Sequence, residues 1–475
     1  MNYTQIPSVN LTNNEVQKAF DAAVKNLTEI NTIPCDFTVY NATGLLNPEV
    51  PFMMRAGGSY QTPWTRDAAI NTWAAGRLLE PQVARNTLYA VCVKDAKGEP
   101  IIQPDDQRWD RCVWCVGAWQ YFLATGDMEF LTVARGIVER ALKRLDEEWF
   151  SGEVGLYRGG SFFNDGISGY PKDIYMPGKD HSFMGEHPGT ETICSFSTNC
   201  IYCEAWNILD RMNAVLGISD DEPAKRHAAL KESILRTFWN GEEGKCSYLL
   251  YPDGRIDPSQ ELSGISFGVL FGILPESALE NLMDEEYGIP SIMPPFPDLF
   301  SKERPGRHNN LVWPFLNGFY IQAAAGAGKV QLAGEELRKM TALLNSADGI
   351  YEIYNPYDGH VDGGWQIGGD DLQGHLWDSC PDQTWSATSY IGAVLQGIFG
   401  IRMEEDGICF RPCVPEYLKD SSVRGLMIRG KKYAVTLSGF GTEVEAMTLN
   451  GKTVDAAKIG YADAAEENEI ILTLK

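Results

Sequence analysis

The sequence predicts a mainly α-helical protein in which six helical hairpins form an (α/α)6 barrel, followed by a small β module. Three observations predict this fold class. Apolar residues recur with a helical period over about twelve segments. The connections alternate between very short turns and long loops, and the period changes to that of β-strands after residue 402. We therefore expect a barrel domain over residues 1–401 and a β domain over residues 402–475.

The predicted helices pair in order along the chain, so that each pair forms one hairpin. Asn13 is placed as the N-cap of the first helix, because a short polar side chain there accepts from the free N–H groups of the first turn. Pro314 fits the first turn of a later helix. The helices are expected at residues 13–31, 65–79, 82–93, 110–125, 128–149, 194–216, 222–239, 260–271, 276–285, 311–325, 328–346 and 383–400.

The connections between these helices are of two kinds. The turns "LEP" (79–81) and "TGD" (125–127) are very short. The remaining connections are long loops, and loops of that length are uncommon in a compact domain unless they carry function. We expect the functional face of the barrel on their side. The long loops cover residues 32–63, 94–109, 150–193, 286–310 and 347–382.

The last seventy or so residues alternate in the manner of strands. The segment 450–451 is Asn-Gly, the strongest short signal for a two-residue hairpin turn. The expected strands lie in "GICFRPCVP", "VRGLMIRGKKYAVTLSG", "EVEAMTLNGKTV" and "NEIILTLK".

Composition and charge exclude several classes of function. With 44% apolar and 22% charged residues, the chain has the composition of a soluble globular protein. Its net charge of -24 argues against nucleic acids and anionic membranes as partners. No stretch reaches the roughly 18 apolar residues of a membrane span. The first residues do not resemble a signal peptide, so we expect a cytoplasmic protein, or a periplasmic one if a leader has been removed.

Eleven cysteines include two CxxC spacings, Cys112–Cys115 and Cys200–Cys203. Such spacings occur in zinc sites. Both pairs lie in amphipathic helices, where a small thiol packs well in the core. We favour packing in a reduced compartment, and we expect no metal and no cofactor.

The long loops and the helix starts beside them hold most of the candidate polar and aromatic groups. Aromatic side chains are abundant, with twelve Trp and twenty Tyr, and they stack on sugar faces as well as filling cores. The candidates are Trp64, Arg66 and Asp67 in "TPWTRDAAI", Asp110 and Trp114 in "DQRWDRCVW", Asp165 in "GGSFFNDGISGY", His308, Trp313 and Asn317 in "GRHNNLVWPFLNGFY", and Glu352 in "GIYEIYNPYDGH".

Two of these carboxyls lie among aromatics, one in each half of the chain. Cleavage of a glycosidic bond needs a protonated acid at the leaving oxygen and a second carboxylate for water or the anomeric carbon. We expect aromatic packing to raise the pKa of Asp165 and keep it protonated. Glu352 would be the second carboxylate. Because the chain has 64 acidic residues, solvated loop carboxylates remain the alternative interpretation of this pattern.

These motifs resemble the six-hairpin glycosidases, most closely glycoside hydrolase family 63, with the family 15 glucoamylases and the glycogen-debranching amylo-α-1,6-glucosidases as relatives. "WTRDAAI" is similar to the glucoamylase segment "TWTRD". That similarity implies that Arg66 and Asp67 hold the hydroxyls of the terminal sugar and that Trp64 stacks on it.

Further motifs follow in the same order as in those families. "FFND" and "GYPK" are similar to "TWMD" and "DYPR", which implies that Asp165 is the general acid, with Asp173 as the second choice. "YEIYNPYDG" is similar to "YENYNPxTG", which implies that Glu352 is the general base. "NLVWPFLNGFY" resembles "GPVWPxxNY" and "QTWSATSY" resembles "FSWSAA", which places Trp313, Asn317 and Trp385 at the sugar site.

The sequence therefore predicts an inverting exo-acting α-glycosidase, of bacterial α-glucosidase type, that removes a terminal glucose-like sugar from an oligosaccharide or glycoside. Inversion requires the two carboxyls to lie roughly 6.5–9.5 Å apart. The C-terminal β module and the loop 363–383 differ from family 63 and leave alternatives. A disaccharide phosphorylase is one, supported by His308 and His375; a rhamnosidase-like enzyme is another. A non-catalytic carbohydrate-binding protein is the alternative of another class.

Overall fold

In the computed structural model, six α-helices form a closed inner ring within the described residues. The structure describes residues 6–104, 107–179, 181–282, 288–293, 300–368, 371–454 and 457–475. Each inner helix packs against the next, and the last packs back on the first. In ring order they are α3 (Thr65–Asn71), α6 (Asp110–Thr125), α8 (Phe196–Leu216), α10 (Leu262–Leu270), α11 (Pro314–Gly326) and α13 (Thr384–Gly392).

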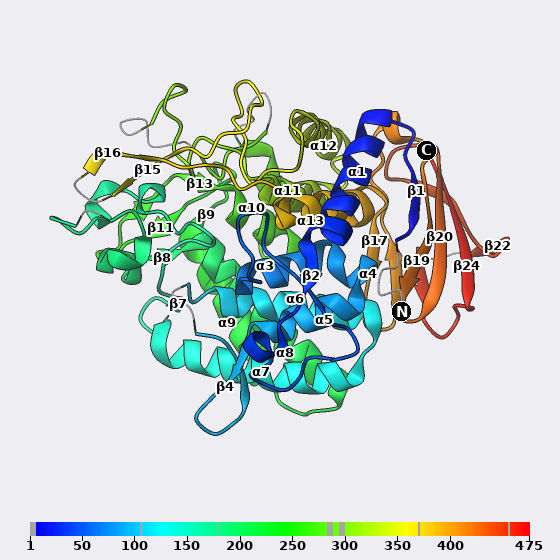
Figure 1. The fold of residues 1–475 in the computed structure, drawn as a ribbon, viewed down its shortest axis with the longest axis horizontal. Helices are drawn as coiled ribbons and strands as arrows, with labels where there is room; N and C mark the ends of the chain where they lie inside the picture. Colours follow the sequence, from blue (N-terminus) through cyan, green and yellow to red (C-terminus); the bar gives the residue numbers. More distant parts are fainter. Residues whose placement is uncertain are drawn as a thin grey trace.

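A second layer of helices covers the ring (Figure 1). Helix α1 packs on both α12 and α13, so the first helix of the chain completes the hairpin of the last inner helix. The (α/α)6 barrel predicted from the sequence is confirmed. The outer helices are α5 (Pro81–Ala90), α7 (Met128–Trp149), α9 (Glu222–Phe238), α12 (Val330–Asn345) and α1 (Asn14–Lys25).

The sequence explains which helices lie inside. Helix α7 buries one face only, whereas nearly every residue of α11 is buried. Small residues allow the inner helices to approach closely: a Cβ on Gly117 of α6 would lie 2.8 Å from the backbone of Ala69 in α3. Asn13 caps α1 by accepting from two backbone N–H groups, as predicted. Pro314 lies in the first turn of α11, as predicted, but the helix begins at Pro314 and not at residue 311.

Several helices continue as short irregular turns. Helices α1, α3 and α13 each continue directly into a π-helical segment, in which the backbone hydrogen bonds span five residues and not four. The additional helices are η1 (Asn26–Asn31), α2 (Phe37–Tyr40), η2 (Thr72–Gly76), α4 (Arg77–Leu79), η3 (Ile167–Gly169), η4 (Lys172–Ile174), η5 (Met184–Glu186), η6 (Pro188–Glu191), η8 (Ala393–Ile398) and η9 (Glu416–Leu418).

The helix predicted at 276–285 is wrong over its described part. The chain forms the 3-10 helix η7 (Glu276–Asn281), and residues 283–285 lie outside the described residues. Tertiary contacts occupy the end of this segment. The Asn281 side chain donates to the carbonyl of Gly244, and its own carbonyl accepts from Gln260, so these groups bond to neighbouring loops and not within an α-helix.

The end of the chain forms the predicted β module. A six-stranded sheet has the order β1-β19-β20-β24-β21-β22, in which only β20 and β24 run parallel. A three-stranded sheet has the order β17-β18-β23. The strands are β1 (Ser8–Asn10), β17 (Ile401–Met403), β18 (Gly407–Phe410), β19 (Ser422–Ile428), β20 (Lys431–Ser438), β21 (Val444–Leu449), β22 (Lys452–Val454), β23 (Lys458–Gly460) and β24 (Glu467–Leu474).

Two details connect this module to the sequence and to the barrel. Asn450 and Gly451 have φ angles of 50° and 76°, the left-handed conformation that an Asn-Gly hairpin turn requires, as predicted. Strand β1 comes from the N-terminal segment, which was predicted to belong to the barrel, and pairs with β19 at the sheet edge (Figure 1). The backbone N–H of Arg429 donates to Ala124 at the end of α6.

Short two-stranded pairings shape the long loops. The longest is β15 (Trp365–Gly368) with β16 (Asp371–Leu376), which projects from the barrel (Figure 1). The others are β2 (Thr32–Pro34), β3 (Phe52–Met54), β4 (Cys92–Lys94), β5 (Pro100–Ile102), β6 (Phe150–Ser151), β7 (Leu156–Tyr157), β8 (Cys194–Ser195), β9 (Trp239–Asn240), β10 (Lys245–Cys246), β11 (Leu249–Leu250), β12 (Ile256–Asp257), β13 (Gln260–Glu261) and β14 (Ile292–Met293).

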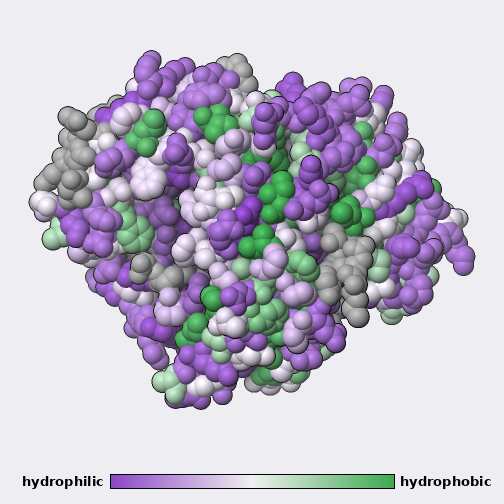
Figure 2. Space-filling view, viewed as in Figure 1, coloured by the Kyte–Doolittle hydropathy of each residue, from purple (hydrophilic) through white to green (hydrophobic). Residues whose placement is uncertain are grey.

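The face of the molecule seen in Figure 2 is largely polar. Hydrophilic residues cover most of the face in Figure 2, and hydrophobic residues gather on it in small separate groups. Among the described helices, none is both long and apolar enough to cross a bilayer.

Candidate active site

The long loops converge on one cavity of about 340 Å³. Each of the five predicted long loops supplies at least one lining residue, which agrees with the functional side inferred from loop lengths. These residues are Tyr60, Gln107, Asp165, Arg307 and Glu352, in chain order. A cavity of this size lies within the usual range for small-ligand sites.

Most of the predicted site residues line this cavity. They come from distant parts of the sequence, from the starts of inner helices and from the loops before them. Gln107, Arg307 and Gln383 also line it and were not predicted. The predicted residues that line it are Trp64, Arg66, Asp67, Asp110, Asp165, Trp313, Glu352 and Trp385.

Four candidates lie elsewhere. Trp114 is buried within the helical layers, where its Nε1 donates to the carbonyl of Leu88. Asn317 lies between α11 and α12 and donates to Glu336 at 2.5 Å, because its position on the helix turns it away from the barrel interior. Asp173, the second choice for the acid, forms an exposed ion pair with Arg255. His308, the fourth, is buried and is not among the residues that line the cavity, although its Nε2 lies 3.3 Å from Asp165 Oδ1.

The loop that carries Asp165 has an unusual backbone. Phe163 has a φ of 55°, a left-handed conformation that is strained for a bulky residue. Its ring packs against His308, Trp313 and Phe315 with centroids 5.6, 5.1 and 5.1 Å away. This packing holds the strained turn, and the turn brings the next acidic residue, Asp165, to the cavity.

A buried carboxylate fixes the other end of this loop. Ser161 Oγ donates to Glu261 Oε2 at 2.5 Å, and the backbone N–H of Ser197, at the start of α8, donates to Glu261 Oε1 at 2.5 Å. The side chain of Glu261 thus joins the Asp165 loop to an inner helix. Burial raises the pKa of Glu261 to about 7 although these hydrogen bonds oppose that shift.

Three side chains surround the Asp165 carboxyl, which is 39% exposed in the cavity. His308 Nε2 lies 3.3 Å from Oδ1, Gln107 Nε2 donates to Oδ2 at 3.2 Å, and Arg66 Nη2 lies 3.8 Å from Oδ2. Burial alone would raise the pKa of Asp165, but these polar and positive neighbours lower it below its usual value. The predicted rise of the Asp165 pKa from aromatic packing is therefore wrong.

Glu352 is more deeply buried, with 6% of its side chain exposed. Its Oε2 accepts from Arg307 Nη2 at 2.8 Å, and Arg307 Nη1 donates to the carbonyl of Gly363 at 2.8 Å. Burial raises the pKa of Glu352; the Arg307 charge opposes this rise and the Asp165 charge adds to it.

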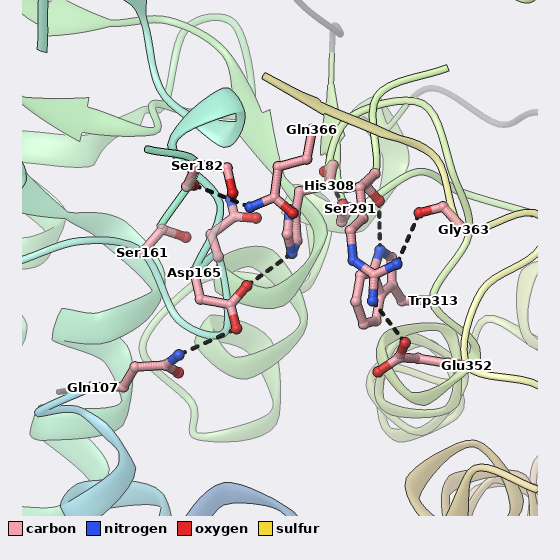
Figure 3. Close-up of polar contacts among 12 residues, drawn as sticks. Gln107, Ser161, Asp165, Ser182, Ser291, His308, Trp313, Glu352, Gly363 and Gln366 are labelled. Carbon is pink, nitrogen blue, oxygen red and sulfur yellow. Dashed lines mark hydrogen bonds and ion pairs between the residues drawn. The ribbon is translucent and has the colours of Figure 1, made fainter. Parts of the chain in front are cut away.

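Two consecutive residues thus contact the two carboxyls. Arg307 contacts Glu352, and His308 contacts Asp165. Figure 3 shows Asp165 with Gln107 and His308 on one side of the site and Glu352 on the other. The sequence contained the signal for Arg307, because it directly precedes the candidate His308 in "GRHNN".

Charged side chains lie at the starts of the inner helices α3 and α6. Arg66 Nε lies 3.7 Å from Asp110 Oδ1. Asp67 is buried, and its Oδ1 has no hydrogen-bond partner among the described residues. Burial raises the pKa of Asp67 to about 7, and nearby Glu352 and Asp165 add to this rise while Arg66 opposes it. A buried oxygen without a partner at a cavity wall is suited to accept a hydrogen bond from a ligand.

Aromatic rings form the remaining walls. Trp385 stacks on Phe315 with centroids 4.2 Å apart, and Trp313 meets Trp385 edge to face at 6.1 Å. Trp64 is 50% exposed at the rim. Flat apolar walls combined with carboxylates and guanidinium groups suit a ligand that has both apolar faces and hydroxyl groups. Within the described part of the chain, no group of His, Cys, Asp and Glu residues is arranged to hold a metal ion.

Part of the chain resembles a known family of protein domains. Residues 168–386, just under half of the chain, match the family model of the mannosylglycerate hydrolase MGH1-like glycoside hydrolase domain. No curated protein matches the chain. The matched segment includes Arg307, His308 and Glu352 and begins three residues after Asp165.

Solved structures show the same fold at low sequence identity. A sialidase superposes with a TM-score of 0.66 and 14% identity, over 98% of this chain and 41% of that protein. The family 63 mannosylglycerate hydrolase from Thermus thermophilus, in complex with glucose, superposes with a TM-score of 0.57 and 13% identity, over 79% of this chain and 99% of that protein. The family 78 rhamnosidase of a Bacillus species superposes with a TM-score of 0.53 and 14% identity, over 91% of this chain and 41% of that protein.

The chain spans about two fifths of the length of the sialidase and of that rhamnosidase. The predicted similarity to six-hairpin glycosidases, and among them to glycoside hydrolase family 63, is confirmed. The matched domain supports a glycoside hydrolase as the enzyme class.

Proposed function

We propose that this protein is an inverting exo-acting α-glycosidase that hydrolyses a terminal, glucose-like α-linked sugar from an oligosaccharide or glycoside. One observation carries the proposal. Two carboxyls, Asp165 and Glu352, line one sugar-sized cavity, and each is held by its own polar partner from the segment 307–308. The glycoside hydrolase domain matched by residues 168–386 supports the reaction class.

In the proposed reaction, Asp165 donates a proton to the glycosidic oxygen as the bond between that oxygen and the anomeric carbon breaks. Glu352 accepts a proton from a water molecule whose oxygen forms the new bond to the anomeric carbon from the opposite face. The products are a sugar of inverted configuration and a free hydroxyl on the leaving group. Both carboxyls exchange protons with water before the next cycle.

The proposed reaction requires the protons of the two carboxyls to redistribute when the sugar binds. The pKa of Asp165 is lowered there and that of Glu352 is raised, which is the reverse of what the reaction needs. The Asp165 side chain is 39% exposed to the cavity, and a bound sugar would exclude that water. Desolvation raises the pKa of a carboxyl, so substrate binding would favour the protonated acid.

The sugar would be held by the groups at the cavity wall. Arg66, Asp67 and Asp110 would bind its hydroxyls, and Trp313 and Trp385 would pack on its apolar faces. The proposal of a glucose-like sugar is consistent with the glucose complex of the Thermus thermophilus enzyme. We also propose a reducing compartment, because all eleven cysteines are free thiols buried in the fold.

The decisive experiment separates the roles of the two carboxyls. An α-glycosyl fluoride has a leaving group that needs no proton, so Asp165→Asn should hydrolyse it at a rate near that of the wild type. The same variant should lose most activity towards a disaccharide, by about 10²–10⁴-fold. Glu352→Gln should lose activity towards both substrates. Asp173→Asn, which removes an exposed carboxyl, serves as the control.

The initial product is followed by NMR of the anomeric proton, with and without phosphate. A β-anomer that appears first without phosphate supports inversion by hydrolysis. Fluoride hydrolysis retained in Glu352→Gln but lost in Asp165→Asn would reverse the two roles. A sugar phosphate formed only with phosphate would identify a phosphorylase, and release of rhamnose alone from a panel of glycosides would identify a rhamnosidase.

A further inference from the structure

Strand β15 lies between the segment that holds Arg307 and the loop that carries Asp165. On one side, the backbone N–H of Arg307 donates to the carbonyl of Trp365 at 2.9 Å. On the other side, a Cβ on Gly368 would lie 3.1 Å from the backbone nitrogen of Ser182. One short strand therefore contacts both halves of the site.

The side chain of Gln366 extends from this strand to the Asp165 loop. Gln366 is buried, and its Nε2 donates to the carbonyl of Ser182 at 3.0 Å. The same carbonyl accepts from the backbone N–H of Ile167 at 2.8 Å, so Ser182 is bonded to the turn that directly follows Asp165. Because a carbonyl oxygen only accepts, the bond to Ser182 fixes which end of the Gln366 amide is its NH2 group.

The NH2 group of Gln366 also faces His308. A Cβ on Gly166 would lie 2.5 Å from Gln366 Nε2 and 3.0 Å from His308 Nδ1, so both nitrogens border the space that this glycine leaves open. Figure 3 shows the Gln366 amide between Ser182 and the His308 ring. His308 is fully buried, and its Nδ1 has no hydrogen-bond partner among the described residues. Since an amide NH2 group has two hydrogens and Ser182 accepts one, the second remains for Nδ1.

The two ring nitrogens of His308 thus face groups of opposite character. Nε2 lies 3.3 Å from Asp165 Oδ1, an acceptor, and Nδ1 faces the Gln366 NH2 group, a donor. Both neighbours favour a neutral ring whose proton is on Nε2, because the partners of an imidazole decide which nitrogen carries the proton. Burial lowers the pKa of His308; Asp165 opposes this shift, and the charges of Arg307 and Arg66 add to it.

We propose that Gln366 is a positioning residue that keeps His308 neutral, with its ring proton on Nε2, so that Asp165 can hold the proton that it gives to the glycosidic oxygen. The proposal rests on the proposed function, since it assigns the role of the acid to Asp165. A second proton on Nδ1 would place a positive charge beside Asp165 and hold that carboxyl ionised. The Gln366 NH2 group only donates, so it offers no acceptor to that second proton.

The test compares two replacements of Gln366, both of which lose the bond to Ser182. Glu offers an acceptor to the Nδ1–H of a charged His308, whereas Met offers no strong one. We expect Gln366→Glu to lower kcat/KM for an α-linked disaccharide by about 100-fold near neutral pH and to move the alkaline limb to lower pH, because a charged His308 lowers the pKa of Asp165. Gln366→Met should lose only about threefold, with a smaller move of that limb. Gln331→Glu, exposed on α12, is the control. Equal losses in Gln366→Glu and Gln366→Met would reduce Gln366 to a structural contact and overturn the proposal.

The protonation of His308 gives a second measurement that does not depend on turnover. NMR of nitrogen-labelled histidines distinguishes the two neutral forms of the ring from the charged form, and His308→Phe identifies the His308 signals. Near neutral pH we expect a neutral ring with its proton on Nε2 in the wild type and a charged ring in Gln366→Glu. If the wild type cleaves no sugar yet this difference is found, the proposed function fails and the effect of Gln366 on His308 stands. A charged ring or an Nδ1 proton in the wild type, or the same ring form in both proteins, would overturn that effect.

Discussion

At the scale of single residues, the arrangement of the two carboxyls depends on two consecutive side chains. Arg307 contacts Glu352 at 2.8 Å and His308 lies 3.3 Å from Asp165. The Cα atoms of consecutive residues are about 3.8 Å apart, a distance fixed by covalent geometry. The relative position of the two carboxyls is therefore tied to one rigid piece of backbone as well as to the two loops that carry them.

Replacement of Arg307 by Met should impair the proposed base. The Arg307 charge lowers the pKa of Glu352, so its removal should raise that pKa further and move the acidic limb of the kcat/KM profile to higher pH. We expect a loss of about 100-fold near neutral pH, equivalent to about 2.7 kcal/mol. Arg304→Met, which alters a nearby Arg packed on Trp365, is the control. An acidic limb that stays in place would contradict this assignment.

Replacement of His308 by Phe should change the proposed acid. Phe preserves the stacking on Trp313, whose centroid lies 5.2 Å from that of His308, but removes the contact with Asp165. Gln107, Arg66 and Arg307 remain near Asp165. Because His308 lowers the pKa of Asp165, the variant should raise it, and the alkaline limb of kcat/KM should move to higher pH.

We expect a loss of about tenfold at the optimum of His308→Phe, because Asp165 loses one of its orienting contacts. His375→Phe, an exposed position on β16, is the matched control. A pH profile of His308→Phe that superposes on that of the wild type would exclude His308 as the partner of the acid.

The sequence identified the residue types of most site residues, but it did not show which helix face each side chain lies on. Asp165 and Glu352 were predicted because both lie among aromatics in long loops and because their motifs resemble those of family 63. Trp114 and Asn317 have the same residue types as true cavity residues, yet they lie one helical face away. Periodicity assigns a residue to a helix, but the face that meets the cavity depends on how the helices pack.

At the scale of elements, Glu261 joins strand β13 to the Asp165 loop and to the start of α8. Its folded-state pKa of about 7 lies above the ordinary value of 4.5. A raised carboxyl pKa contributes stability that is present at low pH and is lost as the pH rises through about 7. The ionised form of Glu261 therefore opposes folding in the upper part of this range.

Glu261→Gln should remove this pH dependence. Gln keeps the shape and stays neutral, as the protonated carboxyl does. The variant's free energy of unfolding minus that of the wild type should increase by about 3 kcal/mol from about pH 4 to about pH 8, because only the wild type loses stability as Glu261 ionises. Urea denaturation at both pH values measures it, with exposed Glu243→Gln as the control. A constant difference between variant and wild type would show that Glu261 does not titrate in this range.

Close contact between inner helices makes a matched pair of glycine substitutions informative. Gly117→Ala would place a methyl group 2.8 Å from the backbone of Ala69, and we expect a destabilisation of about 1–3 kcal/mol. Gly136→Ala, on outer helix α7, meets only the flexible end of Arg140, and we expect a stabilisation of about 0.5–1 kcal/mol. Thermal or urea unfolding measures both. Equal effects would contradict the close packing of α3 on α6.

Element prediction succeeded where local pattern decides the structure. Helices with a clear apolar stripe and an identifiable cap, such as α1 with Asn13, began where the sequence indicated. The segment 276–281 and strand β1 were not identified, because their conformations depend on residues far away in the chain. A three-residue strand that pairs with β19 carries no periodic signal of its own.

At the scale of the whole molecule, charge adds to the selectivity of the cavity. The chain has a net charge of -24, and the catalytic cavity contains Asp67, Asp110, Asp165 and Glu352 against Arg66 and Arg307. The field of such a surface repels anions over a distance that salt shortens, from about 30 Å at 0.01 M to about 8 Å at 0.15 M.

A salt titration should reveal this selectivity. KM for a neutral α-glycoside should stay nearly constant between about 0.01 and about 0.15 M salt. The inhibition constant of the matching sugar acid, which differs by one carboxylate, should fall severalfold over the same range as salt screens the repulsion. Tighter binding of the acid at low salt would show that an Arg in the cavity faces it directly.

The contact of α1 with α13 affects how the protein folds during its synthesis on the ribosome. Some 370 residues separate the starts of these two helices. At synthesis rates of about 5–20 residues per second, α1 leaves the ribosome roughly 20–70 s before its partner exists. During that interval the apolar face of α1, which includes Val16 and Phe20, has no finished barrel to cover it. The ring can therefore close only after the last inner helix has left the ribosome, and until then the apolar face of α1 can associate with other exposed apolar surfaces.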